Sequence, residues 1–238
     1  MNTERVSSGI EGLDPLIGGG FVKGRSYLIS GEPGTGKTLL SLQYILDGLK
    51  KGEKGIYVSI DEKPSHIIED ATAMGWDLKK YLDNGSFQIL DVSGHFSEAR
   101  LGKSGKIEVT KITEELNKHV KKTGAKRLVI DPIAPLISKS DIFSEVQEYI
   151  RVLIFMVEEV TGCTTLFTSH VPVGTNKLSQ YGIEEFIVSG IILLSIVKQA
   201  NKYLRTLFVR KMRSTKTDLA EYSFEMIKER GLVLRHPL

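Results

Sequence analysis

The stretch Gly31-Glu32-Pro33-Gly34-Thr35-Gly36-Lys37-Thr38 lies between a short apolar run and a segment with helical spacing. Residues 26–30 are apolar enough for a buried strand, and apolar side chains at 39, 40, 42, 45, 46 and 49 follow the period of a helix. A glycine-rich loop between a strand and a helix, with the pattern G-x-x-x-x-G-K-[ST], is the phosphate-binding P-loop. The sequence therefore predicts a site for a nucleoside triphosphate.

Each residue type in this loop has a chemical reason. The glycines let the backbone curl so that successive N–H groups point at phosphate oxygens, and the helix that follows adds its dipole. Lys37 is placed to reach the β and γ phosphates, and the hydroxyl of Thr38 is placed to ligate Mg²⁺. The residues expected to contact the nucleotide here are Gly31, Pro33, Gly34, Thr35, Gly36, Lys37, Thr38 and Leu39.

Strand-like and helix-like segments alternate along most of the chain, which is typical of β-α-β units and a parallel sheet. The expected strands are 26–30, 55–60, 86–92, 126–131, 163–169 and 187–196, and the expected helices are 38–50, 64–74, 107–122 and 141–160. Three further strands, 204–212, 221–226 and 231–235, follow without intervening helices. The pattern predicts an α/β fold with a mostly parallel twisted sheet, helices on both faces and a C-terminal antiparallel extension.

Length and composition set further bounds. A chain of 238 residues suits one domain spanning 1–238. No apolar stretch reaches the roughly 18 residues of a membrane span, and residues 1–11 have no signal-peptide apolar core, so a cytoplasmic protein is expected. The only cysteine, Cys163, lies in an apolar run and is interpreted as a buried strand residue, which leaves no disulfide within the chain.

The net charge is only +3, but its distribution is uneven. Seven basic residues occur between positions 198 and 216 with no acidic residue among them: Lys198, Lys202, Arg205, Arg210, Lys211, Arg213 and Lys216. Such a stretch fits a polyanionic ligand, or else a strand edge that lysines protect from aggregation.

Acidic residues follow two of the expected strands. Asp131 ends the run Leu128-Val129-Ile130 and is interpreted as the Walker B carboxylate that, with Thr38, anchors Mg²⁺. Asp61 and Glu62 end another strand, and one of them is expected to be the general base that deprotonates the attacking water. Both also fit solvated loop acids before the Pro64 helix.

A weaker signal ends the strand at 163–169. Thr168, Ser169 and His170 stand where a polar side chain could contact the γ phosphate, and Ser169 is included among the expected nucleotide contacts. A lone histidine at a strand end fits a solvated residue equally well.

Together these residues resemble the single-domain, archaeal-type relatives of KaiC, the circadian-clock ATPase, within the RecA superfamily. The resemblance begins with Ser8-Gly9-Ile10-Glu11-Gly12-Leu13-Asp14 and the glycine-rich segment 18–24, and it continues through the acidic pair, Asp131, the segment 181–186 and Lys211-Met212-Arg213-Ser214-Thr215. It implies a RecA-like P-loop NTPase core, ATP and Mg²⁺ as cofactors, and a ring, expected to be a hexamer, with ATP between subunits.

The resemblance also implies a role for Lys211, Met212 and Arg213 as nucleotide contacts. In KaiC-like assemblies a K-x-R pair on one protomer reaches the γ phosphate held by its neighbour. Residues two apart in a strand project to one face, so Lys211 and Arg213 can converge on one anion as a trans-acting arginine finger does. Catalytic roles are thus expected for Lys37, Asp61, Glu62, Asp131, Lys211 and Arg213.

Two positions depart from clock KaiC. Asp61 stands where those domains carry glutamate; if the first acid of the pair is the base, the shorter side chain reduces its reach to water, whereas if Glu62 serves, little changes. Glu184 and Glu185 stand where the autophosphorylating half carries a Ser-Thr pair, so autokinase activity at that place is not expected.

Two alternatives to a hydrolysing ring remain. One is a RecA paralogue that binds single-stranded nucleic acid, with loops 93–106 and 171–182 lining a channel to which Lys177 and Tyr181 would add charge and stacking. The other is a signalling scaffold that binds ATP as a structural ligand and seldom hydrolyses it. A protein partner fits either reading, and no membrane partner is expected.

Overall fold

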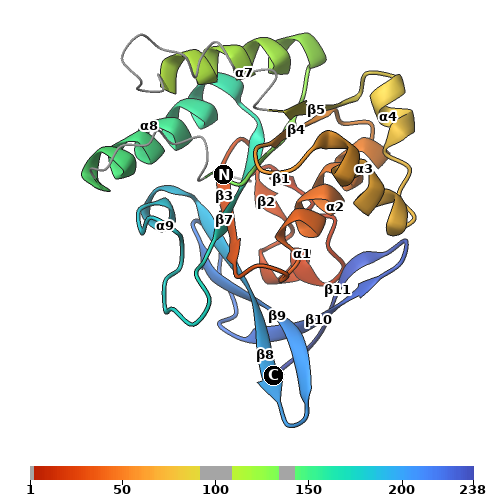
Figure 1. Cartoon of the computed structure of the whole chain (residues 1–238), viewed down its shortest axis with the longest axis vertical. Helices are drawn as coiled ribbons and strands as arrows, with labels where there is room; N and C mark the ends of the chain where they lie inside the picture. The colour runs from red at the N-terminus through yellow and green to blue at the C-terminus, as the bar shows by residue number, and fades with distance from the viewer. Residues whose placement is uncertain (1–2, 92–108, 134–142) are drawn as a thin grey trace.

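The structure is a computed structural model that describes residues 3–91, 109–133 and 143–238. Within these residues the main sheet has nine strands in the order β11-β10-β9-β8-β3-β7-β6-β4-β5 (Figure 1). Their bounds are β3 Ser26–Gly31, β4 Gly55–Ser59, β5 Phe87–Asp91, β6 Arg127–Asp131, β7 Thr164–His170, β8 Gly190–Gln199, β9 Lys202–Met212, β10 Glu221–Ile227 and β11 Gly231–Pro237.

The sheet is parallel from β8 to β5 and antiparallel from β9 to β11. Parallel neighbours need crossovers, and the chain supplies them as α2 Lys37–Lys50, α3 Pro64–Ala73, α4 Lys79–Asp83, α7 Val109–Thr123 and α8 Phe143–Thr161. The last strands are joined without helices: β8 to β9 and β10 to β11 by short turns, and β9 to β10 by residues 213–220. The predicted fold class is thereby confirmed, including the C-terminal antiparallel extension.

Helices cover both faces of the parallel part of the sheet. Consecutive strand residues point to opposite faces, so each of these strands contributes side chains to two cores. In β3, Tyr27 and Ile29 belong to the core that packs against α2 and α3, whereas Leu28 belongs to the core beneath α7 and α8. Figure 1 shows α7 and α8 on one side of the sheet and α2, α3 and α4 on the other. Burial on both sides explains why these strands are nearly continuous apolar runs.

A short ribbon precedes the main sheet. β1 Arg5–Val6 pairs antiparallel with β2 Phe21–Val22, and α1 Leu13–Leu16 lies between them. The Arg5 guanidinium donates to the carbonyl oxygens of Ile17 and Gly20, both at 2.8 Å, which holds the glycine-rich turn against the ribbon. Sequence periodicity did not predict these elements or α4, because each is too short to show a repeat.

One predicted strand is wrong at its start. Residues 187–189 do not belong to a strand, because Glu184–Ile187 form the short helix α9 and β8 begins only at Gly190. The Glu184 carboxylate accepts hydrogen bonds from the backbone N–H groups of Tyr181 and Ile183, and this bonding turns the chain before the strand can start. β8 in turn runs on to Gln199, beyond the predicted end at 196.

The other predicted elements match the structure to within a few residues. The predicted loop 171–182 contains no helix or strand, whereas loop 93–106 lies outside the described residues. Cys163 is buried as predicted, one residue before β7. In the part of the chain that the structure describes, no helix combines the length and apolar character needed to cross a membrane.

Candidate functional site

The predicted site residues gather at one edge of the sheet because of the strand order. β3, β7, β6 and β4 are neighbours in that order and parallel, so their carboxyl ends lie side by side. The P-loop follows β3, His170 ends β7, Asp131 ends β6, and Asp61 and Glu62 follow β4. Ligands of open parallel sheets bind at this edge.

The P-loop requires glycine at specific positions. Gly34 and Gly36 have φ angles of 78° and 103°, in the left-handed region that favours glycine. A Cβ at Gly31 would lie 2.3 Å from the carbonyl oxygen of Leu194 in β8, so a side chain there would separate the two strands. The curl of the loop is thus fixed by backbone geometry before any ligand binds.

Lys37, the first residue of α2, turns its side chain into this curl. Its Nζ donates to the carbonyl oxygens of Gly31 at 2.8 Å and Glu32 at 2.9 Å, and burial lowers the pKa of the amine despite the nearby Asp131 carboxylate. The amine therefore already lies inside the loop that would surround a phosphate.

Asp131 is the centre of a polar cluster. Thr38 Oγ1 donates to Asp131 Oδ2 at 2.9 Å, so the two predicted metal ligands lie in contact. The Tyr57 hydroxyl also donates to Oδ2, and the Thr168 hydroxyl donates to Oδ1. Burial and the Asp131 charge raise the pKa of Tyr57 far above that of a free phenol, so Tyr57 stays a hydrogen-bond donor.

Tyr57 was missed as a site residue at the sequence level, and Thr168 was named only as a candidate contact of the γ phosphate, not as a partner of Asp131. Both lie within apolar strands, where a tyrosine or threonine is consistent with an ordinary core position. The available signal was position, because Tyr57 lies two residues before the end of β4 and Thr168 two before the end of β7, beside the strand that carries Asp131.

A cavity of about 460 Å³ lies beside Asp131. It is called the acidic cavity here and is lined by Thr38, Asp61, Glu62, Lys63, His66, Asp131, Pro132 and His170. Burial raises the pKa of Asp61 and of Glu62, and repulsion by other carboxylates, Asp131 among them, adds to the rise. Burial and the Lys37 charge lower the pKa of His170, whose Nδ1 is buried and has no hydrogen-bond partner among the described residues.

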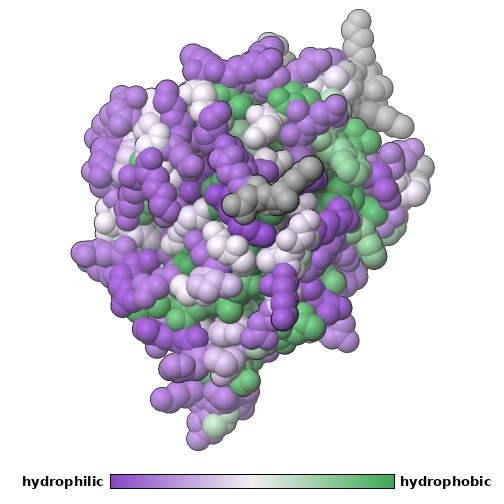
Figure 2. Space-filling view, turned by 180° about the vertical axis from the view of Figure 1, so that it is seen from behind, coloured by the Kyte–Doolittle hydropathy of each residue, from purple (hydrophilic) through white to green (hydrophobic). Residues whose placement is uncertain are grey.

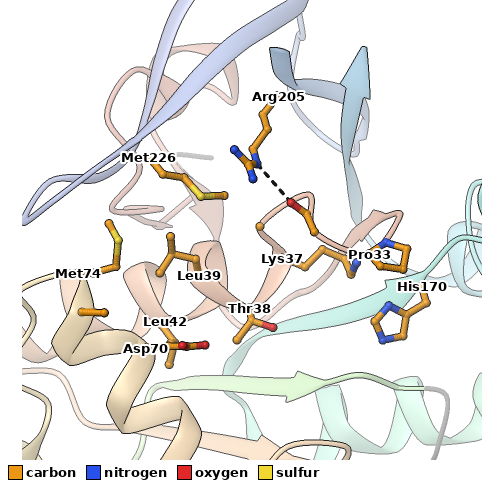
Figure 3. A pocket seen from close by; sticks show the side chains of 13 residues that line it. Pro33, Lys37, Thr38, Leu39, Leu42, Asp70, Met74, His170, Arg205 and Met226 are labelled. Atoms are coloured by element: carbon orange, nitrogen blue, oxygen red, sulfur yellow. Dashed lines mark hydrogen bonds between the residues drawn. The ribbon is translucent and has the colours of Figure 1, made fainter. Parts of the chain in front are cut away.

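A second cavity of about 520 Å³, the P-loop cavity, is lined by Pro33, Gly34, Gly36, Lys37, Thr38, Leu39, Leu42, Asp70, Ala73, Met74, His170, Arg205 and Met226. Figure 3 shows the thioethers of Met74 and Met226 at one end, His170 at the other, and Lys37 and Thr38 between them. Arg205 donates from Nε to the Gly34 carbonyl oxygen at 3.2 Å. At the sequence level Arg205 was only one member of the basic stretch, since its approach to the P-loop depends on the pairing of β8 with β9.

Two predicted contacts, Ser169 and Met212, are placed differently. The Ser169 hydroxyl is fully buried and donates to Glu184 Oε1 at 3.2 Å, rather than facing the acidic cavity. The Met212 side chain belongs to the hydrophobic core, so only its backbone is available to a ligand. Lys211 and Arg213, which are expected to act on a neighbouring subunit, line neither of the two cavities of their own chain.

Lys211 and Arg213 nevertheless converge, as their spacing predicts. Lys211 Nζ donates to the carbonyl oxygens of Glu185 and Val188, both at 2.8 Å, and Arg213 Nη2 donates to that of Phe186 at 2.9 Å. Burial and the neighbouring guanidinium lower the pKa of Lys211. The pair is held by the backbone around α9, next to the Phe186 side chain, which is 67% exposed.

A strand, a P-loop whose lysine lies within its curl, and a carboxylate bonded to the P-loop threonine define a RecA-like P-loop nucleotide-binding protein. A family model described as "ATPase: KaiC" matches residues 6–237. The chain therefore belongs to the KaiC ATPase family, as its resemblance predicted, and membership of this family supports ATP binding.

Individual relatives agree with this assignment. The circadian clock oscillator protein KaiC of Prochlorococcus marinus subsp. pastoris is 35% identical over 227 residues, which cover 95% of this chain but 44% of that protein, so the chain spans less than half of KaiC. The UPF0273 protein PH0284 of Pyrococcus horikoshii is 33% identical over 244 residues, covering 98% of this chain and 94% of that protein. The crystal structure of the KaiC-like protein PH0186 from P. horikoshii matches with a TM-score of 0.83 at 33% identity, covering 98% of this chain and all of that one.

Proposed function

We propose that residues 1–238 form a single ATPase domain that binds ATP with Mg²⁺ and hydrolyses it to ADP and phosphate. The domain acts in a ring, expected to be a hexamer, with the nucleotide between subunits. The observation that supports this most directly is the contact between Thr38 and Asp131, 2.9 Å apart, at the junction of a phosphate-binding loop and an acidic cavity.

The triphosphate binds along the P-loop. Backbone N–H groups of the loop and the Lys37 amine bind phosphate oxygens. To do so, the amine gives up its hydrogen bonds to the carbonyl oxygens of Gly31 and Glu32 and donates to the phosphate instead. Thr38 and Asp131 offer hydroxyl and carboxylate oxygens, the ligands that Mg²⁺ prefers. When bound there, Mg²⁺ neutralises charge on the phosphate oxygens.

Hydrolysis takes place on the acidic side. Asp61 or Glu62 accepts a proton from a water molecule as it attacks the γ phosphorus, and ADP leaves with its β-phosphate oxygen. Their raised pKa values make them stronger proton acceptors than exposed carboxylates. His170 lines both cavities and presents a neutral imidazole to the γ phosphate.

Lys211 and Arg213 complete the site of a neighbouring subunit. Two features support an action in trans: the pair lies outside both cavities of its own chain, and it flanks the exposed Phe186, a side chain suited to a subunit contact. Two cations delivered to the γ phosphate stabilise charge that grows in the transition state.

The test compares the wild type with Arg213→Ala by light scattering, with and without Mg-ATP, and by phosphate release on the same samples. We expect a nucleotide-stabilised ring in both and a loss of turnover of about 10³-fold in the variant, as for other arginine fingers. A monomer with full turnover, or an Arg213→Ala protein as active as the wild type, would refute the intersubunit site. Lys198→Ala, a change in the same basic stretch on the β8–β9 hairpin, is the matched control.

One observation favours binding of single-stranded nucleic acid as a second candidate. The β8–β9 hairpin projects from the body, its tip is mainly hydrophilic (Figures 1 and 2), and it pairs Lys198 with Tyr203, which is 72% exposed. A cation beside an exposed ring suits a stacked base and its phosphate. Binding of labelled single-stranded DNA that weakens with salt and with Tyr203→Ala would support it.

A further inference from the structure

Glu184 is a buried acid with an unusual set of partners. Its side chain has no exposed surface, and no salt bridge to it is found in the described part of the chain. Its Oε1 accepts from Ser169 Oγ at 3.2 Å and Tyr181 N at 3.3 Å, and its Oε2 accepts from Ser179 Oγ at 2.8 Å and Ile183 N at 3.1 Å. Three donors, and the Ser179 hydroxyl that Glu184 shares with the Glu185 carboxylate, thus compensate for the burial of one carboxylate.

These donors come from two separate segments. Ser169 belongs to β7, directly before His170 and the two cavities, and its oxygen also accepts from Gln180 N at 3.1 Å. The other three donors belong to the loop that follows β7. The carboxylate therefore ties this loop to the end of the strand that carries His170.

The same residue opens the segment that holds Lys211 and Arg213. α9 has only four residues, too few to be stable alone, so its position depends on tertiary contacts. The carbonyl oxygens that accept from Lys211 and Arg213 belong to residues 185, 186, 187 and 188, within four positions of Glu184. A displacement of α9 would move these carbonyls and with them both cations.

We propose that Glu184 is a positioning residue: its carboxylate anchors α9 to β7, and α9 in turn sets the direction in which Lys211 and Arg213 are presented to the adjacent subunit. Glu184 itself touches no nucleotide. This inference rests on the intersubunit site proposed above. It assigns to the buried acid a role in the reaction of the neighbour rather than of its own subunit.

Glu184→Gln is the informative substitution because it keeps the shape and removes the charge. A glutamine has one acceptor oxygen, and its NH₂ group would face two of the four donors, so about half of the hydrogen bonds are lost. We expect kcat to fall about tenfold or more, with KM changed less than about twofold, since misplacing a catalytic group affects the transition state more than binding. Glu185→Gln is the matched control, because Glu185 contacts Ser179 through its carboxylate but holds Lys211 only through its backbone.

A mixing experiment separates this role from a general loss of structure. Glu184→Gln chains, which keep an intact P-loop, are assembled with equal amounts of Lys37→Ala chains, which keep an intact Glu184. At random assembly about a quarter of the interfaces pair an intact P-loop with an intact Lys211 and Arg213, so turnover should rise several-fold above the mean of the separate samples. Mixing Arg213→Ala with Lys37→Ala chains provides the reference.

The outcomes are distinct. Recovery in both mixtures supports the positioning role. Recovery with Arg213→Ala but not with Glu184→Gln shows that Glu184 acts within its own subunit and overturns the inference alone, as does a Glu184→Gln protein with wild-type turnover. No recovery in either mixture overturns the intersubunit site and the role of Glu184 together. If Glu184→Gln does not fold, Ser179→Ala removes one donor, and the same criteria apply to its smaller loss of kcat.

Discussion

The substitution Gly48→Ala tests the packing between α2 and β6 at the ends of these elements that are far from the site. Gly48 lies in α2, where alanine is normally favoured over glycine by about 1 kcal/mol. The structure indicates instead that this substitution lowers the stability of the fold. A Cβ at Gly48 would lie 2.4 Å from Arg127 Nε and 2.5 Å from Arg127 Cδ, about 1 Å closer than van der Waals contact permits.

Arg127 cannot move away without cost, because its buried guanidinium is held on every side. It donates to Glu53 Oε2 at 2.5 Å, Asp47 Oδ2 at 3.0 Å, and the carbonyl oxygens of Tyr44 and Ser7 at 2.7 and 3.0 Å. Breaking a buried ionic network of this kind costs about 3–5 kcal/mol. After the helical gain, the expected net loss in the free energy of unfolding is about 2–4 kcal/mol.

Urea and thermal unfolding measure this loss directly. For a chain of this size the expected fall in Tm is roughly 4–16 °C. The cause is tested in an Arg127→Ala background, where the clashing atoms are absent and Gly48→Ala should no longer destabilise, giving a coupling energy of a few kcal/mol. If the Gly48→Ala protein is as stable as the wild type, or more stable, the clash with Arg127 is refuted as the controlling effect.

Two further predictions concern the site. Tyr57→Phe removes a hydrogen-bond donor from Asp131, so we expect the free energy of unfolding to fall by about 1–2 kcal/mol. We also expect the Mg²⁺ concentration for half-maximal turnover to rise about tenfold. The control is Tyr44→Phe: the Tyr44 hydroxyl donates to the Thr164 carbonyl oxygen, so its loss should lower stability without changing the Mg²⁺ dependence. The general base loses its proton-accepting form as the pH falls. Since burial raises the pKa of Asp61 and Glu62, kcat/KM should decline at a higher pH than the usual pKa values of 3.8 and 4.5 of these groups, and a decline centred below 3.8 would contradict the assignment. The variants Asp61→Asn and Glu62→Gln show which group is the base.

Much of the site could be predicted from the sequence, because each part is local. The P-loop is a continuous stretch whose glycines, lysine and threonine have roles set by backbone geometry. Asp131 and the acidic pair are recognisable because each follows a run of strand residues. Parallel strand direction places them at the same edge of the sheet, and strand order then makes them neighbours.

Other contacts could not be predicted, because they join residues whose proximity depends on strand order and register. Tyr57 and Thr168 reach Asp131 only because β4 and β7 flank β6. Arg205 reaches the P-loop because β9 pairs with β8 at the edge beside β3. Ser169 looked like a phosphate contact, but strand alternation turns it toward Glu184 and leaves Thr168 beside Asp131.

The sequence by itself thus determined the class of fold and the identity of the phosphate-binding loop, since hydrophobic periodicity and glycine geometry are properties of short segments. Only the tertiary structure decided which polar groups surround Asp131, that Gly48 must lack a side chain, and that Lys211 and Arg213 are held by α9. These depend on the order and register of strands far apart in the chain, which bring together side chains that no local pattern relates.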